Sequence, residues 1–333
     1  METSHEVRVG DARDLSVERV DLVVTSPPYP MVEMWDDTFS AQDPAIGTAL
    51  DDGEGDRAFR LMHDVLDGVW ARLADVVREG GIVAVNVGDA TRSMGEFQQY
   101  PNAAEITRRM RAHGFSTLPD ILWRKPTNAQ NKFMGSGMLL TNAYPTLEHE
   151  HILLFRNGGP REFPPSDETR YESAYFWDER NTWFSDAWEI RGRRQTLADG
   201  GRDRSGAFPF ELPYRLVSMF SVYDDTVLDP FWGTGTTSLA ALVAGRNSVG
   251  YERDGSLLSA FERAVTDAPA LSTGVVSDRL DSQRAFAADH PTDYEADHYD
   301  FGVKTRRERR IRLYEVADVA RDGRTWHAAY DPV

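Results

Sequence analysis

The sequence predicts an α/β protein built on a doubly wound, mostly parallel sheet. Two observations indicate this fold. Short apolar runs rich in β-branched residues, typical of buried parallel strands, alternate with segments of helical apolar spacing. Several of these runs end in polar or glycine-rich turns, where open α/β sheets place their ligands. A length of 333 residues allows one large α/β domain with one or two smaller parts.

The first two predicted strands end in polar turns. Residues 7–9 form a short strand before Gly10-Asp11, where Asp11 is either a ligand contact or an ordinary turn or cap residue. Residues 20–25 form a buried strand that runs into Ser26-Pro27-Pro28-Tyr29. The prolines stiffen this loop and end the strand, because proline has no N–H to donate. The loop offers a hydroxyl, carbonyls and an aromatic ring, which suit a flat molecule carrying an amino group.

The next segments continue the alternation of strand and helix. The sequence predicts an acidic loop over 36–56, a helix over 58–78 stopped by Gly80-Gly81, a strand over 82–89, a helix over 103–111 and strands over 118–123 and 148–155. His149 and His151 share one face of the last strand, but the helical metal-binding spacing H-E-x-x-H is absent. We therefore predict no metal site.

Residues 156–204 lose the periodic signal and are rich in glycine, proline, arginine and aromatic residues. Arginines beside aromatic residues, such as Arg191, Arg193 and Arg194, suit contacts to DNA grooves. The alternative is an irregular subdomain with a small aromatic core.

Phe208-Pro209 opens a predicted helix that ends at Phe220, and the second strong signal follows over 225–252. A strand over 226–229 leads into Asp229-Pro230-Phe231-Trp232-Gly233-Thr234-Gly235-Thr236-Thr237, followed by a helix over 238–244 and a strand over 247–252 that ends in Glu252. A tight glycine turn lets the backbone approach a ligand, and an acid after the next strand can bind ribose hydroxyls. A nicotinamide site is disfavoured, because Ser238 stands where a third glycine is expected.

Beyond residue 267 the sequence is polar. Residues 304–312 are its most basic run and either form a solvated face or contact phosphate, and residues 310–316 and 325–330 have the pattern of a β-hairpin.

Taken together, the Ser26 loop and the 229–237 block resemble motifs IV and I of the β-class DNA amino-methyltransferases, in which the catalytic loop precedes the cofactor loop. The resemblance implies a Rossmann-like methyltransferase fold that uses S-adenosylmethionine. It divides the chain into a catalytic half (1–125), a core strand with the target-recognition region (126–204), a cofactor-binding half (205–267) and a C-terminal appendix that could contact DNA (268–333).

The resemblance also implies roles for individual residues. The catalytic residues would be Ser26, Pro27, Pro28 and Tyr29. Cofactor contacts would come from Asp11, Phe208, Pro209, Asp229, Pro230, Phe231, Gly233, Gly235, Thr236, Thr237 and Glu252. DNA contacts would come from Lys125, Arg191, Arg193 and Arg194.

The target base follows from one residue. In the family, serine at the first position of the loop favours cytosine N4 and aspartate favours adenine N6, so Ser26 predicts cytosine N4, with adenine N6 as the alternative. The family also suggests a short palindrome such as CTAG as the recognition sequence. Methylation of RNA or of a small amine, and an inactive acidic DNA mimic, are further hypotheses. The intact motifs and the arginine-rich region favour DNA.

The amino-acid composition limits the chemistry that the protein can perform and indicates the environment in which it works. The chain has no cysteine, which excludes disulfides and the cysteine-dependent route to cytosine C5 methylation. Its formal net charge is −17, and only three of 37 basic residues are lysines, a composition that resembles halophilic archaeal proteins. We expect a cytoplasmic protein without a membrane segment or signal peptide, acting on double-stranded DNA, with a restriction endonuclease as a possible partner.

Overall fold

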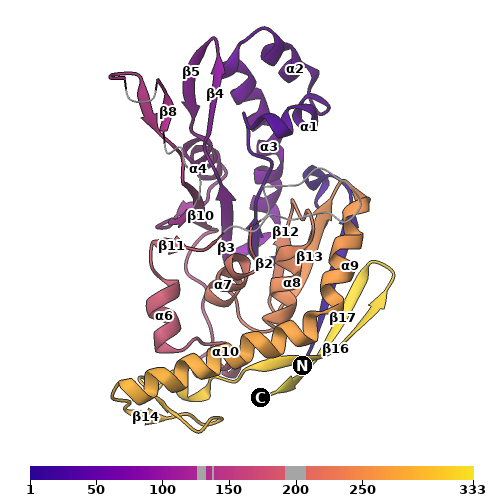
Figure 1. Ribbon diagram of the computed structural model, residues 1–333. Coiled ribbons are helices and arrows are strands. Elements are labelled where there is room, and N and C mark those ends of the chain that lie inside the picture. Colours follow the sequence, from indigo (N-terminus) through magenta and orange to yellow (C-terminus); the bar gives the residue numbers. More distant parts are fainter. Residues whose placement is uncertain (126–132, 137–138, 192–207) are drawn as a thin grey trace.

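One long sheet runs through the computed structural model, which describes residues 1–125, 133–136, 139–191 and 208–333 (Figure 1). Its five central strands, β3, β2, β12, β13 and β1, are parallel, while β10 and the C-terminal hairpin run antiparallel to their neighbours in the centre. The predicted α/β class with a mostly parallel sheet is therefore confirmed. In spatial order the strands are β11 (Ala187–Glu189), β7 (Ile121–Arg124), β10 (His149–Arg156), β3 (Val77–Val87), β2 (Val20–Thr25), β12 (Thr226–Asp229), β13 (Asn247–Glu252), β1 (Glu2–Val9), β17 (Thr325–Pro332) and β16 (Tyr314–Asp322), with β6 (Ser116–Thr117) beside β10.

The chain changes direction across the sheet between β2 and β12. From β2 it passes through α3 (Gly55–Val76) to β3 on one side, and from β12 it passes through α8 (Thr236–Val243) to β13 on the other. The two strands pair directly, with Leu22 opposite Val227 and Val23 opposite Leu228. Ligands of open α/β sheets bind outside the carboxyl ends of the strands at such a switch point. Both loops singled out in the sequence leave the sheet here.

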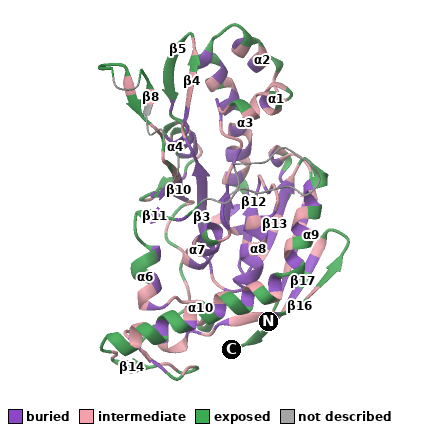
Figure 2. Cartoon of the chain, viewed as in Figure 1, coloured by how far each residue is buried: buried purple, intermediate pink, exposed green. Residues whose placement is uncertain are grey.

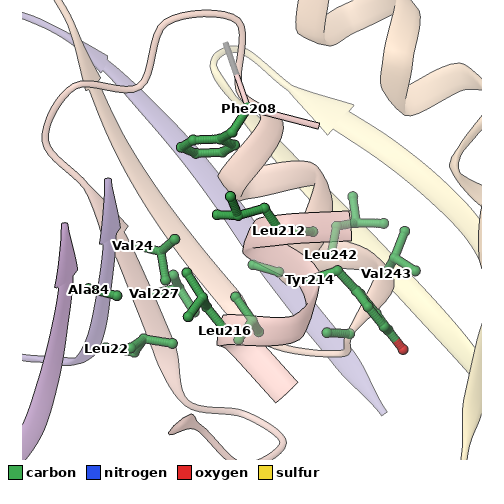
Figure 3. Packing of buried hydrophobic residues seen from close by; sticks show 14 of the residues in the cluster. Leu22, Val24, Ala84, Phe208, Leu212, Tyr214, Leu216, Val227, Leu242 and Val243 are labelled. Carbon is green, nitrogen blue, oxygen red and sulfur yellow. The ribbon is translucent and has the colours of Figure 1, made fainter. Parts of the chain in front are cut away.

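Helices cover both faces of the sheet, and the most buried residues lie in the central strands (Figure 2). Along β2, Leu22 and Val24 join the core beneath α7 and α8, whereas Val23 joins the core beneath α3. Figure 3 shows Leu212 and Leu216 of α7 beside these strand residues. The helices are α1 (Asp36–Ser40), α2 (Pro44–Asp51), α3 (Gly55–Val76), α4 (Asn102–Ala112), α5 (Glu168–Glu172), α6 (Trp177–Trp183), α7 (Glu211–Phe220), α8 (Thr236–Val243), α9 (Leu258–Thr266) and α10 (Ala268–Asp289).

Three small hairpins and four 3₁₀ turns complete the described structure. The first two hairpins project together near α2 (Figure 1), and the ring of Phe97 in one stacks on Tyr144 in the other, with centroids 5.4 Å apart. The hairpins are β4 (Ala90–Met94) with β5 (Glu96–Tyr100), β8 (Phe133–Gly135) with β9 (Ala143–Pro145), and β14 (Tyr294–Glu295) with β15 (Gly302–Val303). The 3₁₀ turns are η1 (Ala12–Asp14), η2 (Glu33–Trp35), η3 (Gly255–Leu257) and η4 (Glu308–Arg310).

The prediction of a loop over 36–56 is wrong, because α1 and α2 lie there and α3 begins at Gly55. Helix α2 starts with Pro44, and the Asp43 side chain caps it by accepting a hydrogen bond from the Ala45 N–H. Phe39 and Ile46 are fully buried against the neighbouring helices. These few apolar residues are enough to hold the two short helices in place.

The predicted end of the helix over 58–78 is also wrong. Helix α3 ends at Val76, and Gly80 and Gly81 lie inside strand β3. Gly80 has φ +78°, and a Cβ there would lie 2.7 Å from the backbone of Arg161. The first glycine therefore allows a close approach of two backbone segments, and it does not stop the helix.

The polar C-terminal region extends the main sheet. The predicted hairpin is confirmed as β16 and β17, although the first strand begins at Tyr314, and β17 pairs with β1. Trp326 and Tyr330 belong to the same core as the central strands. Helix α10 lies across one end of the molecule (Figure 1), and Val276 and Leu280 on this helix form a third small core with Phe176 and Phe301.

None of the described helices is both long enough and apolar enough to cross a membrane.

Candidate active site

A cavity of about 540 Å³ lies at the carboxyl ends of β2, β12 and β13, where the two loops meet. Ser26 and Pro28 line it from one loop, and Gly233 lines it from the other. The predicted site residues that line the cavity are Asp11, Ser26, Pro28, Phe208, Asp229, Pro230, Phe231, Gly233, Thr236, Thr237 and Glu252. Four others, Pro27, Tyr29, Pro209 and Gly235, are not among its lining residues.

The glycine turn after β12 is held in shape from two sides. The Gly233 N–H donates a hydrogen bond of 2.8 Å to Oε2 of Glu252, so the turn is tied to the end of β13. Gly235 has φ +82°, and a Cβ there would lie 2.6 Å from the rings of both Trp232 and Phe261. Gly233 thus faces the cavity, whereas Gly235 packs against the core.

The carboxylates of Glu252 and Asp11 line the cavity at the ends of adjacent strands. Oε1 of Glu252 accepts a hydrogen bond of 2.8 Å from the Asp254 N–H, which orients the carboxylate. A hydrogen bond from the Arg13 side chain is the main cause that lowers the pKa of Asp11 below its usual value. Two charged acceptors beside a glycine turn fit a nucleoside with hydroxyl and amino groups.

A buried hydrogen bond joins β2 to β12, the two strands that lead into the two loops. Oγ1 of Thr25, the last residue of β2, donates to Oδ1 of Asp229 at 2.7 Å, and the same oxygen accepts from the Phe231 N–H at 3.0 Å. Burial raises the pKa of Asp229 to about 6, and the hydrogen bonds from Thr25 and Thr237 oppose part of that rise. Asp229 therefore holds the two loops in register.

The Asp229→Asn variant is expected to change how stability depends on pH. Because the folded pKa of about 6 exceeds the unfolded value of about 3.9, the contribution of Asp229 to stability is fully present below pH about 4 and is lost as pH rises through about 6. Asparagine does not titrate. Between pH about 4 and about 7, wild type should therefore lose about 2–3 kcal/mol of unfolding free energy relative to the variant. Urea unfolding of the cofactor-free proteins measures this difference, and parallel pH profiles would contradict it.

Behind the proline loop lies a hydrogen-bonded cluster of Tyr29, Asn86, Lys125 and Glu150. None of these four residues lines the cavity, but the cluster contacts Ser26, which does. The hydroxyl of Tyr29 is 3.0 Å from Ser26 Oγ and donates to Oε2 of Glu150 at 2.9 Å. The side-chain amide of Asn86 donates to the Tyr29 oxygen at 2.8 Å and to Glu150 Oε2 at 2.7 Å, and Lys125 pairs with Oε1 of Glu150. Burial, followed by the charge of Glu150, raises the pKa of Tyr29 well above its usual value. Tyr29 therefore keeps its proton.

The structure describes two of the four residues predicted to contact DNA, Lys125 and Arg191, and they lie in different environments. Lys125 is bound to Glu150, and its ammonium lies 4.3 Å from the centroid of the Trp123 ring. Arg191 is exposed two residues after the end of β11. Arg193 and Arg194 lie outside the described residues.

Sequence reasoning missed two parts of the site. Asn86 lies in the predicted strand over 82–89, and Glu150 stands beside histidines weighed only as metal ligands, so neither received a role. A second wall of the cavity comes from η2, from α1 and the turn that follows it, and from α3, including residues in the segment predicted as a loop. It consists of Trp35, Thr38, Phe39, Ala41, Gln42, Val65, Leu66 and Val69.

A mostly parallel sheet with a nucleoside-sized cavity at its switch point is typical of Rossmann-like enzymes. Comparison with known proteins shows which family of such enzymes this chain belongs to. Residues 20–263 match the family model described as DNA methylase, and the chain belongs to that family. It is a DNA methyltransferase whose cofactor is S-adenosylmethionine.

Individual relatives agree with this assignment. The chain is 46% identical over 323 residues to the type II methyltransferase M.MthZI of Methanothermobacter thermautotrophicus, covering 94% of this chain and 91% of the relative. It is 47% identical over 278 residues to the type II methyltransferase M.MjaI of Methanocaldococcus jannaschii, covering 79% and 91%. Among solved structures, a putative DNA modification methylase of Thermus thermophilus in complex with S-adenosyl-L-methionine is 31% identical, with a TM-score of 0.59, covering 80% of this chain and 96% of that one.

Proposed function

We propose that this protein methylates the exocyclic N4 of cytosine in a short duplex DNA sequence. The observation that carries the proposal is the meeting of two loops in one cavity, which Ser26 lines together with Gly233 and Glu252. In the family that the sequence resembles, serine at this loop position favours cytosine, and aspartate favours adenine. Ser26 therefore supports cytosine over the adenine N6 alternative.

The chemistry required of the protein is the positioning of a poor nucleophile. The lone pair of an exocyclic amine is conjugated with the ring, and the base must leave the duplex, which costs a few kcal/mol. The Ser26 hydroxyl and the Pro27 carbonyl accept hydrogen bonds from the amine and draw its nitrogen towards tetrahedral geometry. The partly exposed ring of Tyr29 stacks on the base. When bound, S-adenosylmethionine supplies a methyl group on a positively charged sulfur.

No covalent bond between protein and base is needed in this scheme. The rate enhancement would come from orientation and from acceptors placed where the amine develops positive charge. Glu252 and Asp11 would hold the nucleoside part of the cofactor, and the backbone of Gly233 would allow its close approach. The stiff geometry of the Ser26 loop suits this role, because the two prolines limit its motion.

Recognition of DNA is assigned to the segment between the two loops. Arg191, exposed two residues after the end of β11, would contact the duplex together with Arg193 and Arg194. Lys125, the fourth residue predicted to contact DNA, would do so only after leaving Glu150. A short palindrome such as CTAG is the first sequence to test. Such an enzyme would act in the cytoplasm, where the chromosome lies, and could protect it from a cognate restriction endonuclease.

The net charge of the chain supports the proposal that this reaction takes place in concentrated salt. A net charge of −17 would repel phosphate in dilute solution. At about 1 M salt the Debye length falls to about 3 Å, so distant acidic residues no longer act on the DNA. We propose that the protein comes from a halophilic archaeon and binds DNA mainly through shape, base contacts and stacking.

Product analysis tests the proposal directly. The protein is incubated with radiolabelled S-adenosylmethionine and duplex DNA containing CTAG in molar KCl, and the DNA is then digested to nucleosides. The expected label is on N4-methylcytosine. Label on N6-methyladenine would replace cytosine by adenine as the target. Label on RNA or on a small amine offered in parallel, with none on DNA, would overturn the proposal.

A further inference from the structure

A largely buried carboxylate lies behind the loop that carries Ser26. Glu150 lies on β10, and only 12% of its side chain is exposed. Its Oε2 accepts hydrogen bonds from the Tyr29 hydroxyl and from the amide of Asn86, and its Oε1 pairs with Lys125. Glu150 itself is not among the residues that line the cavity. Its influence on the site therefore passes through its neighbours.

The carboxylate determines which way each proton in the cluster points. An ionised carboxylate can only accept hydrogen bonds, so the single hydroxyl proton of Tyr29 is given to Glu150. Asn86 must present its NH₂ group, because an amide oxygen 2.7 Å from the carboxylate would be repelled. Tyr29 then has no proton left for Ser26. Because the Tyr29 proton is already used, the Ser26 hydroxyl must be the donor in their 3.0 Å contact, and Asn86 Nδ2 lies 3.5 Å from the same serine oxygen.

This order leaves Ser26 with only lone pairs to offer to the cavity. A serine hydroxyl normally rotates and can either donate or accept. Here its proton is committed to Tyr29, while the residue itself lines the cavity. An exocyclic amine brings N–H donors, and it therefore needs an acceptor at this point. An aspartate in the same place would accept without help, but a serine needs its proton held elsewhere.

We propose that Glu150 is a positioning residue which, through the Tyr29 hydroxyl, makes Ser26 a hydrogen-bond acceptor for the amine of the target base. This inference rests on the proposed function, since it takes an exocyclic amine as the substrate. Glu150 takes part in no chemical step, because it does not line the cavity.

The test uses two isosteric variants and their combination, with kcat measured on duplex DNA. In Glu150→Gln, an amide NH₂ faces the Tyr29 oxygen, so the tyrosine proton turns to Ser26 and the serine proton turns into the cavity. We expect kcat to fall about 10- to 100-fold, the range set by one charge-assisted hydrogen bond. The Kd for S-adenosylmethionine and the KM for DNA should stay within about threefold of wild type.

Tyr29→Phe removes the middle hydroxyl but keeps the ring, and kcat should fall by a similar factor. Both changes interrupt the same chain of hydrogen bonds from Glu150 through Tyr29 to Ser26. The double variant should therefore have a kcat no lower than that of the slower single variant. Losses that multiply in the double variant would overturn the proposal. Glu262→Gln, which removes the partner of Arg321 outside the cavity, is the matched control and should keep wild-type kcat.

The outcomes separate this inference from the function on which it rests. If wild type does not methylate DNA in the same assay, the proposed function fails. If wild type is active and Glu150→Gln keeps full kcat, only the role of Glu150 fails. If Glu150→Gln does not fold, Tyr29→Phe decides alone: a loss of kcat with unchanged cofactor binding supports the proposal, and full kcat overturns it.

Discussion

Replacing Tyr29 with alanine is expected to reduce kcat at least about 100-fold while cofactor binding stays nearly unchanged. The variant loses the ring that would stack on the base, an interaction of about 1–3 kcal/mol. It also loses the hydroxyl that orders Ser26, worth a further 1.5–3 kcal/mol or so. Tyr29 does not line the cavity that holds the proposed cofactor contacts, so the affinity for S-adenosylmethionine should survive.

Single-turnover methylation of duplex DNA measures the chemical step, and calorimetric titration measures cofactor affinity. Tyr29→Phe should fall between wild type and alanine, because it retains the ring. Tyr294→Ala, at an exposed tyrosine in the β14–β15 hairpin, is the control for removal of an aromatic residue. Wild-type turnover in Tyr29→Ala would remove this residue from the site.

Gly235→Ala should lower the free energy of unfolding by about 2–5 kcal/mol. A non-glycine residue in the left-handed region costs about 1–2 kcal/mol, and overpacking of a core costs about 1–3 kcal/mol. Both penalties apply here, because φ is +82° and the new Cβ would lie 2.6 Å from Trp232 and Phe261, which are both buried.

Gly323→Ala supplies the matched control, since it separates backbone strain from overpacking. Gly323 lies in the turn between β16 and β17 with φ +61°, and no atom lies within 4 Å of its added Cβ. Its variant should therefore lose only the backbone penalty of about 1–2 kcal/mol. Urea unfolding of both variants makes the comparison. Equal losses would show that contact with Trp232 and Phe261 does not constrain Gly235.

Much of the fold was predictable from short-range patterns in the sequence. The strand before Ser26 carries an apolar run and lies buried inside the sheet as predicted, and the predicted strand that ends at Asp229 lies beside it. Helix α10 was missed for a physical reason. Its buried positions include Ser272 and Gln283 alongside Val276 and Leu280, so they form no apolar stripe at helical spacing.

The sequence by itself determined which two loops carry special backbone geometry, because proline fixes φ and glycine permits positive φ at their own positions. The structure brings both loops to one cavity. The sequence also determined that the chain could build no cysteine-dependent chemistry. Only the tertiary structure decided that Glu150, 121 residues further along the chain, accepts a hydrogen bond from the hydroxyl of Tyr29. It also decided that Gly235 packs against the core while Gly233 lines the cavity. Such contacts depend on which strands and helices lie side by side, and that arrangement is set by the burial of the whole core and not by local geometry.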